Sequence, residues 1–147
     1  MHNAFLKFKN YLLGKDKNKL VYRFISEREK KAFDSKDLSQ IGTFWYDLSG
    51  GSTHNYKKGK RYIHLFDKKK DAMTLHLEVG GSKQYFCTYS IPKKILKKYT
   101  GKGFYMVRGY ENYSTIKEYA IPSDEFDFNW LVSIEPKEKL FNADNVK

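Results

Sequence analysis

The chain has little cysteine, proline or tryptophan, and it has no long hydrophobic run. Its 147 residues include one Cys, three Pro and two Trp. The single cysteine, Cys87, excludes an internal disulfide framework and a cysteine zinc site, and the four His offer no ligand spacing. No apolar stretch approaches the ~20 residues of a membrane-spanning helix. The N-terminus alternates Lys with Phe and makes a poor signal peptide, so we expect a cytoplasmic protein with no membrane partner.

Acidic residues are also scarce, because 17 Asp and Glu stand against 28 Lys and Arg, for a net charge of +11. One interpretation is an anionic partner, such as RNA, DNA or an anionic cofactor. The other is a lysine-rich surface that keeps the protein soluble. Only four of the basic residues are Arg, the residue on which bidentate phosphate recognition usually depends. The charge alone therefore leaves both interpretations open.

Apolar and aromatic residues are plentiful, at 40% and 17% of the chain, which indicates a globular protein. The length suits one domain with a real core. We expect an amphipathic helix and linker over residues 1–19, the domain over 20–135, and a polar tail over 136–147 that frays.

Patches of β-forming residues alternate with short helical patterns. Strands are expected at 20–25, 42–48, 61–66, 84–92, 103–109, 115–122 and 130–134. Helices are expected at 4–13, from a capping box at Ser26 to about Phe33, at 67–78 and at 93–99. Six or seven short strands with three or four helices, mixed in order, predict an α+β domain with a largely antiparallel sheet. The polar, glycine-rich segment 49–60 is longer than a simple connector and is expected to have a functional role.

Two charged residues fall on apolar faces of expected strands. Arg23 lies between Val21 and Ile25, and Glu118 lies between Ile116 and Ala120. Burying a lone charge costs several kcal/mol, so these side chains must pair with each other, find other partners or line a cleft. A plain Arg–Glu salt bridge is one interpretation, and a cleft for an anionic ligand is the other.

Three segments together resemble the ADP-ribosyltransferase family. Residues 22–33 (Tyr-Arg-Phe-Ile-Ser-Glu-Arg-Glu-Lys-Lys-Ala-Phe) resemble its opening strand and helix, in which Arg or His follows an aromatic residue. Residues 62–75 resemble its second strand–helix unit, and Glu118 resembles its late-strand catalytic glutamate. The resemblance covers roughly residues 20–135 and implies split antiparallel sheets around an NAD cleft, with short flanking helices.

The resemblance implies a role for several residues toward NAD as substrate. Glu118 would hydrogen-bond the ribose 2′-hydroxyl and stabilise the oxocarbenium-like transition state, and Arg23 would contact the pyrophosphate. Ser26 would support the ribose or phosphate, and His64 would hold the middle position unless it is a structural strand histidine. Four aromatic residues could stack on nicotinamide or simply pack in the core: Tyr22, Tyr46, Tyr62 and Phe66.

Two departures from the family bear on the acceptor. The middle strand carries His-Leu-Phe where many arginine-modifying members carry Ser-Thr-Ser, and Ile116 occupies the place of their second Glu or Gln. The missing polar group argues against an arginine acceptor and leaves nucleic acid, another side chain or a small molecule open. Such an enzyme fits a bacterial or phage toxin or defence effector, for which an antitoxin protein is a conceivable partner.

Other functions remain open beside this one. A basic RNA-binding protein or metal-independent ribonuclease would use His54, His64, Lys60 and Arg61 as acid–base and phosphate groups. A noncatalytic binding module of the same fold would keep Glu118 in an ordinary salt bridge.

Overall fold

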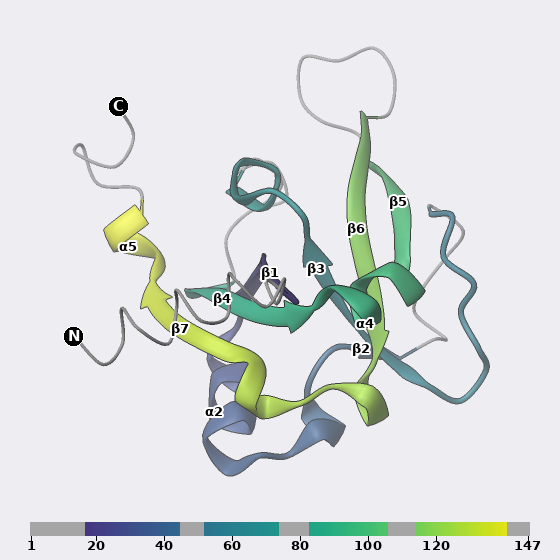
Figure 1. Cartoon of the computed structure of the whole chain (residues 1–147). Helices are drawn as coiled ribbons and strands as arrows, with labels where there is room; N and C mark the ends of the chain where they lie inside the picture. Colours follow the sequence, from purple (N-terminus) through teal and green to yellow (C-terminus); the bar gives the residue numbers. More distant parts are fainter. Residues whose placement is uncertain (1–16, 45–51, 74–82, 106–113, 141–147) are drawn as a thin grey trace.

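A single antiparallel sheet forms the framework of the computed structural model, which describes residues 17–44, 52–73, 83–105 and 114–140 (Figure 1). The strands are β1 (Asn18–Ile25), β2 (Thr43–Phe44), β3 (Arg61–Phe66), β4 (Tyr85–Pro92), β5 (Thr100–Tyr105), β6 (Ser114–Pro122) and β7 (Leu131–Pro136). Their order in the sheet is β5-β6-β3-β1-β4-β7, and β2 pairs with β3 off this path. Every pairing of these strands is antiparallel.

Short helices connect the strands. They are α2 (Glu27–Ser35), α4 (Lys93–Lys98) and α5 (Lys137–Leu140), with the 3-10 turns η1 (Leu38–Gln40), η3 (Ser123–Glu125) and η4 (Phe128–Trp130). Residues 69–73 are also helical. The expected α+β class and mainly antiparallel sheet are therefore confirmed.

The start of α2 follows from its capping sequence. Ser26 is the N-cap, and its hydroxyl oxygen accepts a hydrogen bond from the backbone N–H of Glu29 at 3.2 Å. Two acidic residues in the first turn, Glu27 and Glu29, suit the positive end of the helix dipole. The predicted helix start is confirmed, and Ser26 is occupied in holding it.

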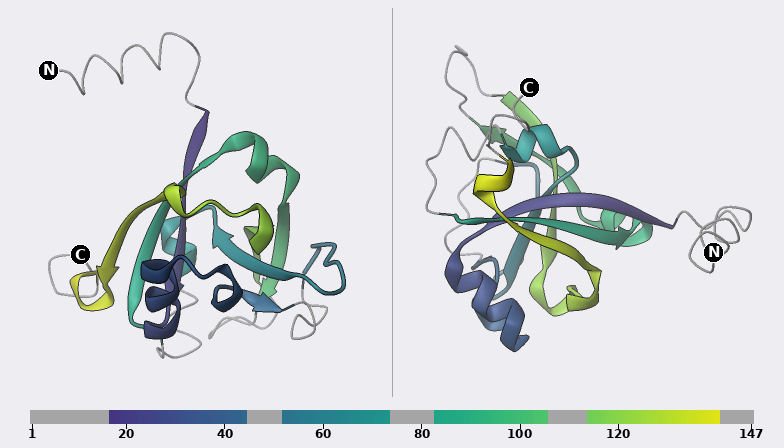
Figure 2. Two further views of the ribbon diagram at one scale, coloured as in Figure 1. Left: turned by 90° about the horizontal axis from the view of Figure 1, so that it is seen from below. Right: turned by 90° about the vertical axis from the view of Figure 1, so that its left-hand side faces the viewer.

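The sheet buries side chains on both faces. The larger core includes Val21, Ile63, Leu65 and Ile121, together with Ala32 and Phe33 of α2. Figure 2 shows α2 on one side of the strands. A smaller cluster, made of Phe24, Ala72, Phe86 and Leu140 with Tyr22, Phe66 and Met73 beside it, involves the 69–73 turn and α5. Figure 1 shows that turn and α2 on opposite sides of the strands.

The sheet opens between its two central strands. β1 and β4 pair along eight residues from Asn18 to Ile25, whereas β1 and β3 pair only at Tyr22 and Phe66. Arg23 reaches across the opening, and its Nη1 donates to the main-chain carbonyl of His64 at 2.9 Å. A side chain thus replaces part of the missing main-chain ladder.

Two boundaries differ from the sequence-based expectation. β5 begins at Thr100 rather than Gly103, because Gly101 and Gly103 are paired strand residues and do not merely end the preceding helix. Residues 137–140 form α5 instead of a fraying tail, because Leu140 is buried in the smaller core. The expected helix 4–13, most of 42–48 and the end of 67–78 lie outside the described residues.

Candidate functional site

Glu118 lies on β6, the strand next to the outer strand β5, and is almost fully buried. In the sheet, Glu118 pairs with Phe66 of β3 on one side and with Gly101 of β5 on the other. Its exposed fraction is 1%, and the neighbours on its face, Ile116 and Ala120, are buried as well. The expectation of a carboxylate on an apolar face is confirmed.

His54 covers this carboxylate. Its Nε2 lies 3.0 Å from Glu118 Oε1, and only 4% of the His54 side chain is exposed. The opposite edge of the ring packs on the backbone of Gly101, where an added Cβ would lie 2.5 Å from both Nδ1 and Cε1. Glycine at position 101 therefore makes the space that lets the imidazole reach Glu118.

The main chain before His54 is fixed to the outer strand of the sheet. The N–H of Thr53 donates to the carbonyl of Lys102 at 2.9 Å, and the N–H of Lys102 donates to Thr53 Oγ1 at 2.8 Å. Ser52 and Gly103 form an additional antiparallel bridge. The first part of the long polar loop thus extends the sheet next to β5, which places His54 over Glu118.

A second histidine lies beside the first. The ring centroids of His54 and His64 are 5.9 Å apart, and His64 Nε2 lies 2.7 Å from the hydroxyl of Tyr56. Burial lowers the pKa of His64 to about 4, so its imidazole is neutral at neutral pH. Ser52 donates to the Tyr56 oxygen at 3.3 Å, and the Tyr56 hydroxyl can then donate to the neutral ring.

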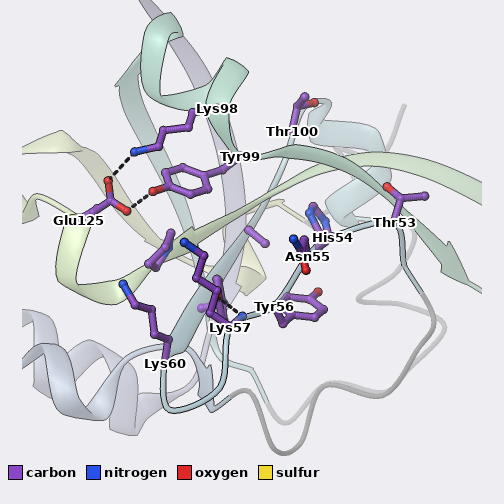
Figure 3. Close-up of a pocket in the computed structure, with 13 residues that line it drawn as sticks. Thr53, His54, Asn55, Tyr56, Lys57, Lys60, Lys98, Tyr99, Thr100 and Glu125 are labelled. Carbon is purple, nitrogen blue, oxygen red and sulfur yellow. Dashed lines mark hydrogen bonds and ion pairs between the residues drawn. The ribbon is translucent and has the colours of Figure 1, made fainter.

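A pocket of about 270 Å³ lies next to this group, between the 53–60 segment, the junction of α4 with β5, and the end of β6 (Figure 3). Its lining includes His54 and the three tyrosines Tyr56, Tyr62 and Tyr99. Ala120 also belongs to the lining, but Glu118 does not. The imidazole of His54 therefore separates the pocket from the buried carboxylate.

The pocket carries more positive than negative charge. Lys57, Lys60 and Lys98 line it, with Glu125 as the acidic member. Lys98 Nζ lies 3.2 Å from Glu125, which also accepts a hydrogen bond from the Tyr99 hydroxyl (Figure 3). Lys60 reaches outward to Asp124 at 3.1 Å. Three lysines near two carboxylates, Glu125 and Asp124, leave a net positive charge that favours an anionic ligand.

Arg23 does not share this site. Tyr22 pairs with Phe66 and Phe66 with Glu118, so these three side chains share one face, and the adjacent Arg23 lies on the other. Its Nη2 lies 2.7 Å from Glu29 Oε1, and its Nε lies 3.3 Å from Oε2. The structure therefore separates the two charges that the sequence suggested as halves of one site.

The Arg23–Glu29 pair is buried and mutually stabilised. Burial alone would lower the pKa of Arg23, but the Glu29 carboxylate outweighs it and raises that pKa. Burial would raise the pKa of Glu29, but the Arg23 guanidinium outweighs it and lowers that pKa. Both groups are ionised at neutral pH, and Arg23 is a structural cation in the opening of the sheet.

The remaining predicted site residues are divided between the pocket and the core. Tyr62 lines the pocket, and its hydroxyl accepts from the N–H of Lys57 at 2.6 Å. Tyr22 instead stacks on Phe86 at a ring-centroid distance of 5.8 Å, and Phe66 packs in the same small cluster. Tyr46 lies outside the described residues.

The acid–base set expected of a nuclease is assembled only in part. His54 and Lys60 line the pocket, and His64 lies behind Tyr56. Arg61 donates to the carbonyl of Gly42 at 3.3 Å and lies over the ring of Phe44, away from the histidines.

Sequence reasoning missed Tyr56, Tyr99 and Gly101. The alternation of His54 with Tyr56 was a usable signal, because two such residues on an extended segment share a face. Nothing local to Gly101 indicates that a histidine 47 positions earlier packs on it.

Comparison with known proteins leaves the family of the chain open. No family model matches it, and neither a curated protein nor a solved structure matches it significantly. The described residues contain no helix long and apolar enough to cross a membrane. They also contain no cluster of three or more His, Cys, Asp or Glu side chains arranged for a metal ion. The class that the structure does define is a small α+β domain with a mainly antiparallel sheet.

Proposed function

We propose that this protein is an ADP-ribosyltransferase that uses NAD, with Glu118 as its catalytic carboxylate. The observation that carries the proposal is a charged residue 1% exposed, on the strand where the family resemblance expects the catalytic glutamate, beside a basic and aromatic pocket. The resemblance implies split sheets, whereas the described strands form one seven-stranded sheet in which β1 and β3 pair only at Tyr22 and Phe66.

The surroundings of Glu118 suit the chemistry of the nicotinamide–ribose bond. That bond breaks with positive charge developing on the ribose, as in glycoside cleavage. A carboxylate between Ile116 and Ala120 acts in a low-dielectric environment, where its attraction for the developing charge is strong. Glu118 would also accept a hydrogen bond from the ribose 2′-hydroxyl.

The pocket supplies the other groups that NAD needs. Tyr56, Tyr62 and Tyr99 offer aromatic surface for nicotinamide, and Lys57 with Lys60 offers positive charge for the pyrophosphate. Arg23 has no part in this version of the site, because Glu29 and the His64 carbonyl engage its guanidinium on the other face.

His54 closes the site in this structure. A carboxylate with 1% exposure cannot touch a ribose until the imidazole above it moves. We therefore place His54 as a positioning residue that holds the Glu118 carboxylate before NAD enters, and NAD entry displaces its imidazole.

A metal-independent ribonuclease is the second candidate, and the His54–Glu118 contact favours it. A carboxylate that holds an imidazole is the arrangement of a general base. However, His54 Nε2 is directed at Glu118, its Nδ1 edge lies on Gly101, and His64 Nε2 is hydrogen-bonded to Tyr56. The Nε2 atoms of both histidines are therefore engaged within the protein, and the ADP-ribosyltransferase fits the geometry better.

One experiment separates the two candidates. The protein is incubated with radiolabelled NAD and separate pools of protein, RNA and DNA, and RNA integrity is followed in parallel without NAD. Consumption of NAD with label transfer to one pool supports the proposal. Cleavage of RNA without NAD, and no consumption of NAD, would support the ribonuclease instead.

A further inference from the structure

A second hollow, of about 320 Å³, lies on the face of the sheet that carries the larger core. Leu96 and Tyr119, both members of that core, form part of its lining. Lysines from three different elements also line it: Lys19 of β1, Lys93 and Lys97 of α4, and Lys117 of β6. We call this set of four lysines with its hollow the lysine groove.

The groove has an excess of positive charge. Asp67, just after β3, is its one carboxylate among the described contacts, and both Lys19 and Lys117 pair with it, the latter at 3.9 Å. Asp67 also accepts a hydrogen bond from the Tyr119 hydroxyl at 2.6 Å. Neither Lys93 nor Lys97 has an ion-pair partner among the described residues, and both are exposed. The four lysine side chains therefore face a single carboxylate, that of Asp67, which already pairs with two of them.

The groove and the pocket lined by His54 meet at one residue. Thr100 lines both hollows. The helix α4 also contributes to both, since Lys97 lines the groove and the next residue, Lys98, lines the pocket. A chain-like ligand that lies in the groove would therefore pass from one face of the sheet to the other around Thr100, at the start of β5, and arrive at the pocket next to His54.

The chemistry of the two hollows identifies the class of ligand. Lysines act as point charges that contact phosphates without reading sequence. An aromatic pocket beside such a groove offers ring faces for an unstacked base, and this combination is typical of single-strand binding. An acidic protein segment would use the lysines but not the adjacent tyrosines Tyr56, Tyr62 and Tyr99.

We propose that the lysine groove binds the phosphate backbone of a single-stranded nucleic acid, which is the acceptor of ADP-ribose. The acceptor role rests on the proposed function, whereas binding does not. In the transfer, the bond from ribose C1′ to nicotinamide breaks and nicotinamide leaves with the electron pair. A bond from C1′ to a nucleic-acid nitrogen or oxygen then forms, and that atom loses its proton to solvent.

The test measures binding in the absence of NAD, so its outcome does not depend on the proposed activity. Fluorescence anisotropy follows a labelled mixed-sequence RNA and the same sequence as single-stranded DNA, with wild-type protein and with K93A/K97A. The matched control is K31A/K139A, which removes the same charge from exposed positions on α2 and α5. All four positions are exposed, so folding should survive and is checked by circular dichroism.

We expect K93A/K97A to weaken binding roughly 20-fold at about 0.1 M salt. The slope of log affinity against log salt concentration should become shallower by about 1.4, as expected when two phosphate contacts to a single strand are lost. The control should change affinity less than about 2-fold. An equal loss of affinity in both variants, or no loss in either, would contradict the proposal that the lysine groove binds nucleic acid. So would displacement of the RNA by poly-glutamate at the same charge concentration, which would indicate an acidic protein partner.

Discussion

The imidazole of His54 lies 3.0 Å from the carboxylate of Glu118, and both side chains are almost wholly buried. They come from a polar loop and from strand β6, 64 positions apart in the sequence. The contact exists because Gly101 leaves room for the ring and because Thr53 pairs with Lys102 on the outer strand. The central residue of the proposed site is therefore covered by the protein's own loop.

The space at Gly101 can be tested by filling it. In Gly101→Ala the new methyl group would lie 2.5 Å from the His54 ring, so the ring or the loop must shift. We expect a loss of about 1–3 kcal/mol in the free energy of unfolding, measured by urea denaturation. The double variant Gly101→Ala/His54→Ala removes the clashing ring and should recover part of that loss. Additive losses in the two single variants would contradict the packing described.

The Arg23–Glu29 pair can be tested as a structural element. Glu29→Gln leaves the buried Arg23 guanidinium without its counter-charge, and we expect a loss of about 3 kcal/mol in the free energy of unfolding. Glu27→Gln, at an exposed position of the same helix turn, is the control and should cost less than about 1 kcal/mol. A Glu29→Gln protein of unchanged stability and raised KM for NAD would contradict this structural role and indicate that Arg23 contributes to NAD binding.

His64 should make stability depend on pH. Its folded-state pKa of about 4 lies below the ordinary value of 6.5, so the unfolded chain binds more protons between these values. Stability is then fully present above pH 6.5 and is lost as the pH falls toward 4, by up to about 3 kcal/mol. Urea unfolding across this window checks the slope, and His64→Asn should flatten it. The lowered pKa of Glu29 contributes only at the acid end, below its ordinary value of 4.5. An equally steep slope in His64→Asn would assign the effect to another group.

Local sequence patterns were sufficient for most of the fold. Local sequence predicted the helix start at Ser26, the strand at 61–66 and the two charges between apolar neighbours, because each depends on residues close in sequence. The face of the sheet on which Arg23 and Glu118 each lie could not be predicted from local sequence, because it depends on how the strands pair. Tyr22, Phe66 and Glu118 are joined by register, and that register places Arg23 on the opposite side.

The glycines at 101 and 103 show a related limit. The sequence predicts a helix that ends at Tyr99 and a strand that begins at Gly103, but in the structure both glycines lie in β5 and pair with Glu118 and Ile116 of β6. The requirement for glycine at 101 comes from a histidine on a distant loop, so no local rule could supply it.

The most direct test of the account is the rate of NAD consumption by wild-type protein and by Glu118→Gln. The substitution preserves the shape of a side chain that is 1% exposed but removes its charge, and Glu138→Gln, at an exposed position of α5, is the control. We expect Glu118→Gln to lower the rate by about 100-fold or more while the protein stays folded by circular dichroism, and Glu138→Gln to leave the rate unchanged. Equal rates of NAD consumption in wild-type protein and folded Glu118→Gln would contradict the proposed role of Glu118.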